Sequence, residues 1–182
     1  MPAPVVLVPY NPEWPARFEA AKAAILGACA GIVTRIEHIG STSVPGMEAK
    51  DIVDVMPGLE HFVDGPRCIE PLTAIGYRYR GELGIPGRHY WTKDDPETGV
   101  RLENVHMYAI GHDEWTAHLA FRDYLRAHDE WRDRYAALKR DLAATHRDDV
   151  EAYAEAKTVF VADAVARHAA ESGSGHVYRR VR

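Results

Sequence analysis

Hydrophobic residues recur at two different spacings along this chain, and the change divides it into a mixed first part and a helical last part. Trp14, Phe18 and Ile25 follow one another at helical spacing, which predicts a helix over residues 11–31. Shorter stretches that are β-branched or alternate between apolar and polar residues come next. These predict strands at 32–39, 51–56, 77–80, 88–93 and 101–110, with a further short segment at 5–9.

Turn and helix signals separate these strands. Pro57-Gly58 is expected to close the strand 51–56, and residues 94–99 form a turn between the last two strands. A helix is predicted within 60–75, ending at Gly76. Tight turns between strands favour a mixed, mostly antiparallel sheet over repeated βαβ units, so the fold class is predicted to be α+β.

From residue 113 onward the chain is rich in Ala, Leu, Arg and Glu, which predicts helices at 113–127, 129–145 and 148–170. We expect residues 1–112 to form an α/β core and 113–170 to pack on it as part of one structural unit. Residues 171–182 are rich in Ser and Gly and then basic, so they are predicted to be a flexible tail.

Composition narrows the possible functions. A net charge of −5 argues against general nucleic-acid binding, which usually needs a basic face. Two cysteines without a CxxC motif make a disulfide framework or a cysteine-rich zinc site improbable. No apolar stretch reaches membrane-spanning length and no secretory leader is visible, so we expect a cytoplasmic protein with no membrane association.

A glycine-hydroxyl turn follows the strand 32–39 and indicates phosphate binding. Glycine lets the backbone approach an anion closely, and such a turn can surround it with N–H groups. Its candidate phosphate ligands are Gly40, Ser41, Thr42 and Ser43. Asp54, on the next strand, is placed to hold a divalent metal that bridges the same phosphate. The alternative is that the hydroxyl side chains only cap the turn.

The string His-Ile-Gly-Ser-Thr-Ser-Val-Pro-Gly-Met at 38–47, continuing to Lys50, closely resembles the GrpB family. The resemblance spans roughly residues 5 to 165 and also includes segments 84–88, 104–107 and 121–126, together with Tyr153 and Lys157. It implies a nucleotidyltransferase-superfamily fold, nucleotide phosphates on the Gly-Ser turn, and Mg²⁺ as cofactor. The resemblance predicts the fold more directly than the reaction, because the reaction depends on the particular residues of the active site.

One carboxylate of the superfamily pattern is missing. Superfamily enzymes usually carry two acids separated by one residue, so that both side chains leave the same strand face. Here Asp51 and Asp54 are three apart and face opposite sides of a regular strand, and Ile52 stands two positions before Asp54. This departure makes two-metal catalysis doubtful. Another element must supply a ligand, one metal must suffice, or the protein does not transfer nucleotides.

The strand 101–110 offers a substitute for the missing acid. Asn104 and His106 share one face, whereas Val105 and Met107 share the other, which is predicted to be core. By strand order, His106 stands where the superfamily often carries its third acid. We predict it to be a catalytic residue and a metal ligand beside Asp54. The alternative is a hydrogen-bonded structural histidine.

Basic residues are expected to surround the phosphate, because Arg binds phosphate with two parallel hydrogen bonds and Lys acts as a point charge. The predicted phosphate ligands of this kind are Lys50, Arg88, Arg101, Arg122 and Lys157. Ordinary surface charge, or the polar face of an amphipathic helix, is the alternative for each of them.

Two functions fit these observations, and a purely structural adaptor is a third hypothesis for which a charged pocket would be unexpected. The first is a nucleotidyltransferase that moves a nucleotidyl group from a Mg-bound nucleoside triphosphate to an unknown acceptor. The second is a module that binds a nucleotide or another phosphorylated small molecule without transfer, or an enzyme that uses the pocket for other chemistry. Some GrpB relatives are fused to a dephospho-CoA kinase, which by resemblance links the second hypothesis to coenzyme A metabolism. The chain has no GxxxxGK[ST] loop, so it is not predicted to be that kinase itself.

Overall fold

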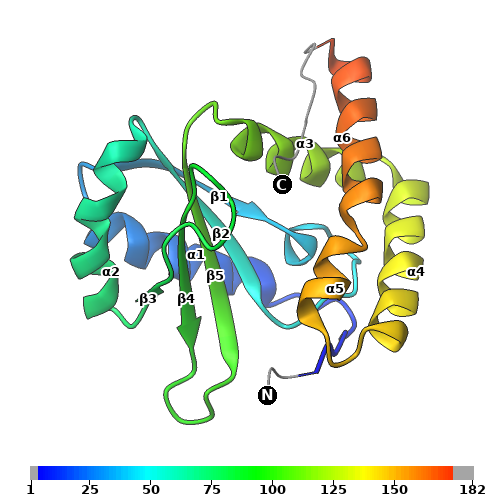
Figure 1. Cartoon of the computed structure of the whole chain (residues 1–182), viewed down its shortest axis with the longest axis horizontal. Helices are drawn as coiled ribbons and strands as arrows, with labels where there is room; N and C mark the ends of the chain where they lie inside the picture. The colour runs from blue at the N-terminus through cyan, green and yellow to red at the C-terminus, as the bar shows by residue number, and fades with distance from the viewer. Residues whose placement is uncertain (1–3, 174–182) are drawn as a thin grey trace.

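A computed structural model describes residues 4–173 of the 182-residue chain. Its centre is a five-stranded sheet in the order β1-β2-β5-β4-β3 (Figure 1). The strands are β1 (Val33–Ile39), β2 (Val53–Leu59), β3 (Arg78–Tyr79), β4 (His89–Asp94) and β5 (Arg101–Ala109). Three of the four neighbouring pairs are antiparallel, and β2 and β5 are parallel. The predicted mixed, mostly antiparallel sheet is therefore confirmed.

Helices cover both faces of the sheet (Figure 1). The α-helices are α1 (Trp14–Ala28), α2 (Ile69–Ala74), α3 (Asp113–Ala127), α4 (Asp129–Thr145), α5 (Val150–Glu155) and α6 (Thr158–Ser172), and the 3₁₀ helices are η1 (Ser41–Ser43) and η2 (Phe62–Cys68). Residues of α1 and α2 pack against Val53, Val55, Val105 and Met107 in the main core. On the other face, Trp115 of α3 packs with residues of β1, β2 and β5.

Several predicted boundaries are wrong by a few residues. The first helix begins at Trp14, because the Asn11 side chain accepts the N–H of Glu13 in a turn that precedes the helix. Residues 5–9 contribute only an isolated bridge between Val8 and Ala49. The helix expected within 60–75 is the 3₁₀ helix η2 followed by the short α2.

The strand β2 does not end at Pro57-Gly58 as predicted, but continues to Leu59. Its antiparallel pairing with β1 runs through Pro57 and Gly58, whereas its pairing with β5 passes from Val55 to Gly58. A β-carbon on Gly58 would lie 2.9 Å from the Trp115 ring, so the glycine is what allows α3 to approach the sheet.

The helical third is one packed layer beside the sheet. Its core joins α3, α4 and α6 with two residues of the segment between η1 and β2, Val44 and Met47. The predicted helix 148–170 is divided into α5 and α6, and α6 continues to Ser172, into the segment predicted to be a tail. Gly173 ends it in a left-handed conformation (φ 66°). The rest of that predicted tail, 174–182, lies outside the described residues.

Candidate functional site

A cavity of about 310 Å³ lies between the sheet and the helical layer. The turn after β1, the strands β2 and β5, and helices α3 to α6 all contribute to its wall. Eight predicted site residues line it, namely Gly40, Ser41, Thr42, Lys50, Asp54, Arg88, His106 and Lys157. The tertiary structure therefore brings together most of the residues that the sequence pattern singled out.

Asp54 is positioned by the pairing of β2 with β5. It lies directly opposite Asn104 in the parallel register, and the Asn104 amide donates to Asp54 Oδ1 over 2.9 Å. The amide oxygen of Asn104 in turn accepts from the Tyr90 hydroxyl at 2.9 Å and from the Arg101 guanidinium at 3.1 Å. Arg101 also pairs with Asp94, so it supports Asn104 and does not line the cavity.

His106 forms a second contact with the same carboxylate oxygen. Its Nε2 lies 3.5 Å from Asp54 Oδ1, and its Nδ1 lies 3.3 Å from the Arg88 guanidinium. Because arginine can only donate, Nδ1 accepts and the ring proton of the neutral imidazole is on Nε2, facing Asp54. Both ring nitrogens are then engaged. These contacts argue against the predicted metal-ligand role and place His106 as an orienting residue for Asp54.

The charge of Asp54 is stabilised by its surroundings. Burial alone would raise the pKa of its carboxyl group, but contact with His106, the Asn104 hydrogen bond and the charge of Lys50 together hold that pKa below its usual range. Asp54 is therefore an anion at neutral pH, suited to bind a cation and poorly suited to accept a proton.

The glycine-hydroxyl turn lies against Asp54. Gly40 has φ 69°, and a β-carbon there would come within 2.3 Å of Asp54 Oδ2, so only glycine allows this approach. Thr42 is fixed by a 3.0 Å contact with Nε2 of His38, which stacks on Phe18. Ser43 faces away from the cavity, and its hydroxyl donates to the Gly40 carbonyl at 2.6 Å. The alternative interpretation, in which a hydroxyl side chain only caps the turn, is therefore correct for Ser43.

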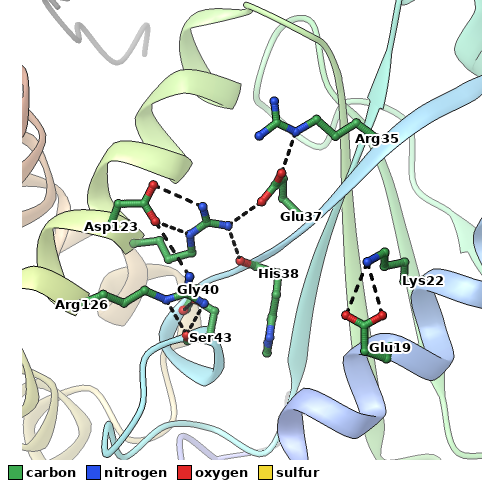
Figure 2. A network of polar contacts seen from close by, with 10 residues as sticks. Glu19, Lys22, Arg35, Glu37, His38, Gly40, Ser43, Asp123 and Arg126 are labelled. Carbon is green, nitrogen blue, oxygen red and sulfur yellow. Dashed lines mark hydrogen bonds and ion pairs between the residues drawn. The ribbon is translucent and has the colours of Figure 1, made fainter.

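Two arginines of α3, neither of which lines the cavity, hold this turn, and Figure 2 shows Arg126 reaching Ser43. Arg126 donates twice to the Ser43 carbonyl, at 2.7 and 3.0 Å. Arg122, predicted to bind phosphate, instead donates to Glu37 and to the His38 carbonyl, at 2.7 and 3.1 Å. Arg122 does not line the cavity and acts as a structural support for the turn.

Several residues that line the cavity were not predicted from the sequence to be site residues. Chief among them are Asn104, His118, Phe121, Tyr135, Lys139 and Tyr153. Tyr135 and Lys139 are four residues apart on α4, a spacing that puts both side chains on one helical face. That spacing was the available signal, but nothing local says that this face turns toward Asp54.

A model of the GrpB family, described as "GrpB protein", matches residues 4–167. The chain belongs to the GrpB family. A relative in Bacillus subtilis, "UPF0157 protein YqkA", is 37% identical over 157 residues, which are 86% of this chain and 45% of that protein. The chain thus spans about half the length of this relative. A "Dephospho-CoA kinase" of Mycolicibacterium paratuberculosis is 30% identical over 91% of this chain and 46% of its own length.

Solved structures agree with the family assignment. The crystal structure of GrpB from Enterococcus faecalis superposes with a TM-score of 0.83 at 32% identity, over 92% of this chain and 99% of that one. The Cid1 poly(U) polymerase bound to MgATP reaches a TM-score of 0.54 at 12% identity, over 75% of this chain and 44% of that one. At this identity the second likeness shows a shared fold alone, and the predicted nucleotidyltransferase-like fold is confirmed.

The donor groups at the cavity determine whether this GrpB chain could hold Mg²⁺. Asp54 is the carboxylate that faces the turn, and Ile52, two positions earlier, lines the cavity with an apolar side chain. Within residues 4–173, no three His, Cys, Asp or Glu side chains cluster as a metal site. Because Mg²⁺ is commonly held by one or two carboxylates and the phosphates of a substrate, the residues fit one ion arriving with a ligand. They do not fit a two-metal pair.

Membrane association was not expected, and none of the described helices combines the length and apolar character needed to cross a bilayer.

Proposed function

We propose that this cavity binds a nucleoside triphosphate with one Mg²⁺ and transfers its nucleotidyl group to a hydroxyl or amine acceptor. The observation that carries the proposal is the contact between the Gly40 turn and Asp54. This contact sets a glycine-hydroxyl turn beside an ionised carboxylate at the wall of a cavity that also contains lysine and arginine side chains. The nucleotidyltransferase-like fold supports it, because nucleotide binding in the Cid1 polymerase occurs on the same fold.

Each residue has a role in this proposal. Asp54 Oδ2 would hold the Mg²⁺, whose chemistry is to neutralise phosphate charge. Ser41 and Thr42 contact the phosphates, and Lys50, Arg88 and Lys157 add positive charge around them. His106 and Asn104 keep Asp54 oriented and ionised. The acceptor attacks the α-phosphorus, pyrophosphate leaves, and the proton passes to solvent because Asp54 is a weak base.

Binding without transfer is the second candidate, and Ile52 favours it. An apolar side chain lines the cavity where superfamily enzymes carry their first acid. The ligand is then a nucleotide or another phosphorylated small molecule, and the pocket serves recognition or a different reaction. The similarity to part of a mycobacterial dephospho-CoA kinase supports a link to coenzyme A metabolism. A cytoplasmic location stays a prediction in both cases.

Calorimetric titration with ATP, GTP, CTP and UTP, each with and without Mg²⁺, tests the proposal. Asp54→Ala is the test variant and Asp51→Ala the matched control, because Asp51 contacts Trp14 and Arg17 of α1 and does not line the cavity. We expect Mg²⁺-dependent binding of one nucleotide, lost in Asp54→Ala and kept in Asp51→Ala.

Pyrophosphate release in the presence of candidate acceptors then separates the two functions. Release that depends on Asp54 supports transfer, whereas binding without release under all acceptors supports the second candidate. If none of the four nucleotides binds, the nucleoside triphosphate site is disproved.

A further inference from the structure

Lys139 is a buried lysine at the cavity wall with an unusual set of neighbours. It lies on α4, is 2% exposed, and lines the cavity. Its ammonium group donates to the backbone carbonyl of Glu48 and lies 5.1 Å from the centre of the Tyr135 ring. A lysine ammonium has three N–H donors, so one carbonyl leaves most of its hydrogen-bonding capacity unused.

Among the residues that the structure describes, no dedicated counter-ion balances the charge of Lys139. The nearby carboxylate of Glu48 already forms an ion pair with the guanidinium of Arg140. Within the described part of the chain, no carboxylate forms an ion pair with Lys139. A buried charge without a partner is costly, and it is tolerated where a ligand supplies the opposite charge.

We propose that Lys139 binds an anionic phosphoryl group of the cavity's ligand and is protonated when that ligand is bound. The inference deepens the proposed function and rests on it for the identity of the ligand as a nucleotide. The anion completes the charge balance that the protein alone leaves open. Ligand binding is therefore coupled to proton uptake.

The electrostatics agree with this geometry. Burial lowers the pKa of Lys139 to about 7, Glu48 opposes the shift, and Arg140 adds to it. Tyr135 presents its ring from the same helix. Lys50 and Lys157 lie 5.9 and 4.0 Å from the centre of the Tyr153 ring, and the cavity lining contains both of these lysines together with the carboxylates of Asp54 and Glu114. An anion bound there stabilises the protonated amine and raises the pKa of Lys139.

The test is calorimetric binding of inorganic tripolyphosphate between pH 6.5 and 8.5, in two buffers that differ in ionisation enthalpy. Lys139→Met removes the amine while keeping the volume and flexibility of the side chain. Lys139→Arg keeps the charge at every pH in this range. Lys22→Met is the control, because Lys22 pairs with Glu19 on α1, away from the cavity. The thermal midpoint of each variant without ligand verifies that it is folded.

For the natural chain we expect close to one proton taken up per tripolyphosphate at pH 8, beyond the uptake measured with Lys139→Met. We expect the affinity to fall roughly tenfold per pH unit above 7, because the unliganded amine is then neutral. Lys139→Met should bind at least tenfold more weakly at pH 6.5, and Lys139→Arg should lose the steep pH dependence. Equal affinity and equal proton uptake in the natural chain and Lys139→Met would overturn the inference.

The same experiment separates this inference from the proposed function. Tripolyphosphate binding with Lys139-dependent proton uptake, but no nucleotide binding, supports the anion site and disproves the nucleotide. Nucleotide binding that Lys139→Met leaves unchanged supports the proposed function and disproves the role of Lys139. If Lys139→Met does not fold, the pH profile of Lys139→Arg decides, and an unchanged steep profile counts against the inference.

Discussion

Gly40 and Asp54 touch so closely that a β-carbon on Gly40 would lie 2.3 Å from Asp54 Oδ2. The turn after β1 and the carboxylate on β2 therefore form one unit. The shape of that unit depends on glycine, because Gly40 also has a positive φ of 69°. A change at this position alters the carboxylate as well as the turn.

Gly40→Ala is expected to lower the free energy of unfolding by about 1–3 kcal/mol through backbone strain. It should also displace Asp54 and weaken tripolyphosphate binding at least tenfold in the presence of Mg²⁺, because Asp54 is proposed to hold that ion. Gly46→Ala is the matched control, since Gly46 has φ 77° but no atom within 4 Å of the added carbon. Urea unfolding and calorimetry measure the two effects. Similar losses of binding in both variants would show that strain, and not the contact with Asp54, is responsible.

His106→Leu should raise the pKa of Asp54, because burial disfavours the ionised carboxylate and the stabilising contact with His106 is lost. A carbon-detected NMR titration of the Asp54 carboxyl group measures this, with the exposed His61→Leu as control. In the natural chain the lowered pKa contributes stability above the unfolded value of about 3.9, and this contribution is lost as pH falls through the folded value. An unchanged Asp54 pKa would contradict the orienting role of His106.

Arg122→Met should cost about 1.5–3 kcal/mol of unfolding free energy, because charge-assisted hydrogen bonds to Glu37 and the His38 carbonyl are lost. The Arg122 side chain is only 10% exposed. Arg132 makes comparable pairs on the surface, with an Asp129 partner that is 79% exposed, so Arg132→Met should cost about 0–1 kcal/mol. Urea unfolding of the two variants compares these losses of unfolding free energy. Equal losses would mean that the hydrogen bonds of Arg122 contribute no more than an ordinary surface ion pair.

The unfolding free energy of the unliganded chain should rise between pH 7 and pH 9 because of Lys139. The folded pKa is about 7, whereas the unfolded amine titrates at about 10.4. In this interval the unfolded state binds more protons than the folded state, so stability increases with pH. The rise should be smaller in Lys139→Met, as measured by urea unfolding at fixed pH steps. A parallel rise in both proteins would mean that Lys139 titrates normally.

Local patterns predicted much of what borders the site. Alternation along β5 correctly assigned Val105 and Met107 to the core and His106 to the other face, because side chains of a strand point to alternate sides. The Gly-Ser turn and Asp54 were predicted as a pair, since they are neighbours in sequence on adjoining strands. The helices of the last third were found for a similar reason, as their periodicity is local. The ends of elements were less accurate, because caps and 3₁₀ turns depend on single hydrogen bonds.

The family, the alternation of strand faces and the chemistry of the turn could all be read from the amino-acid sequence, because each depends on residues near one another in the chain. The parallel pairing of β2 with β5, which sets Asn104 against Asp54, became known from the folded structure. The folded structure also turned Lys139 into the cavity and held Arg122 outside it. These outcomes depend on which faces pack together over long sequence separations. Whether a lysine or arginine side chain contacts a ligand or a neighbouring carboxylate therefore depends on how elements that are distant in the sequence pack together.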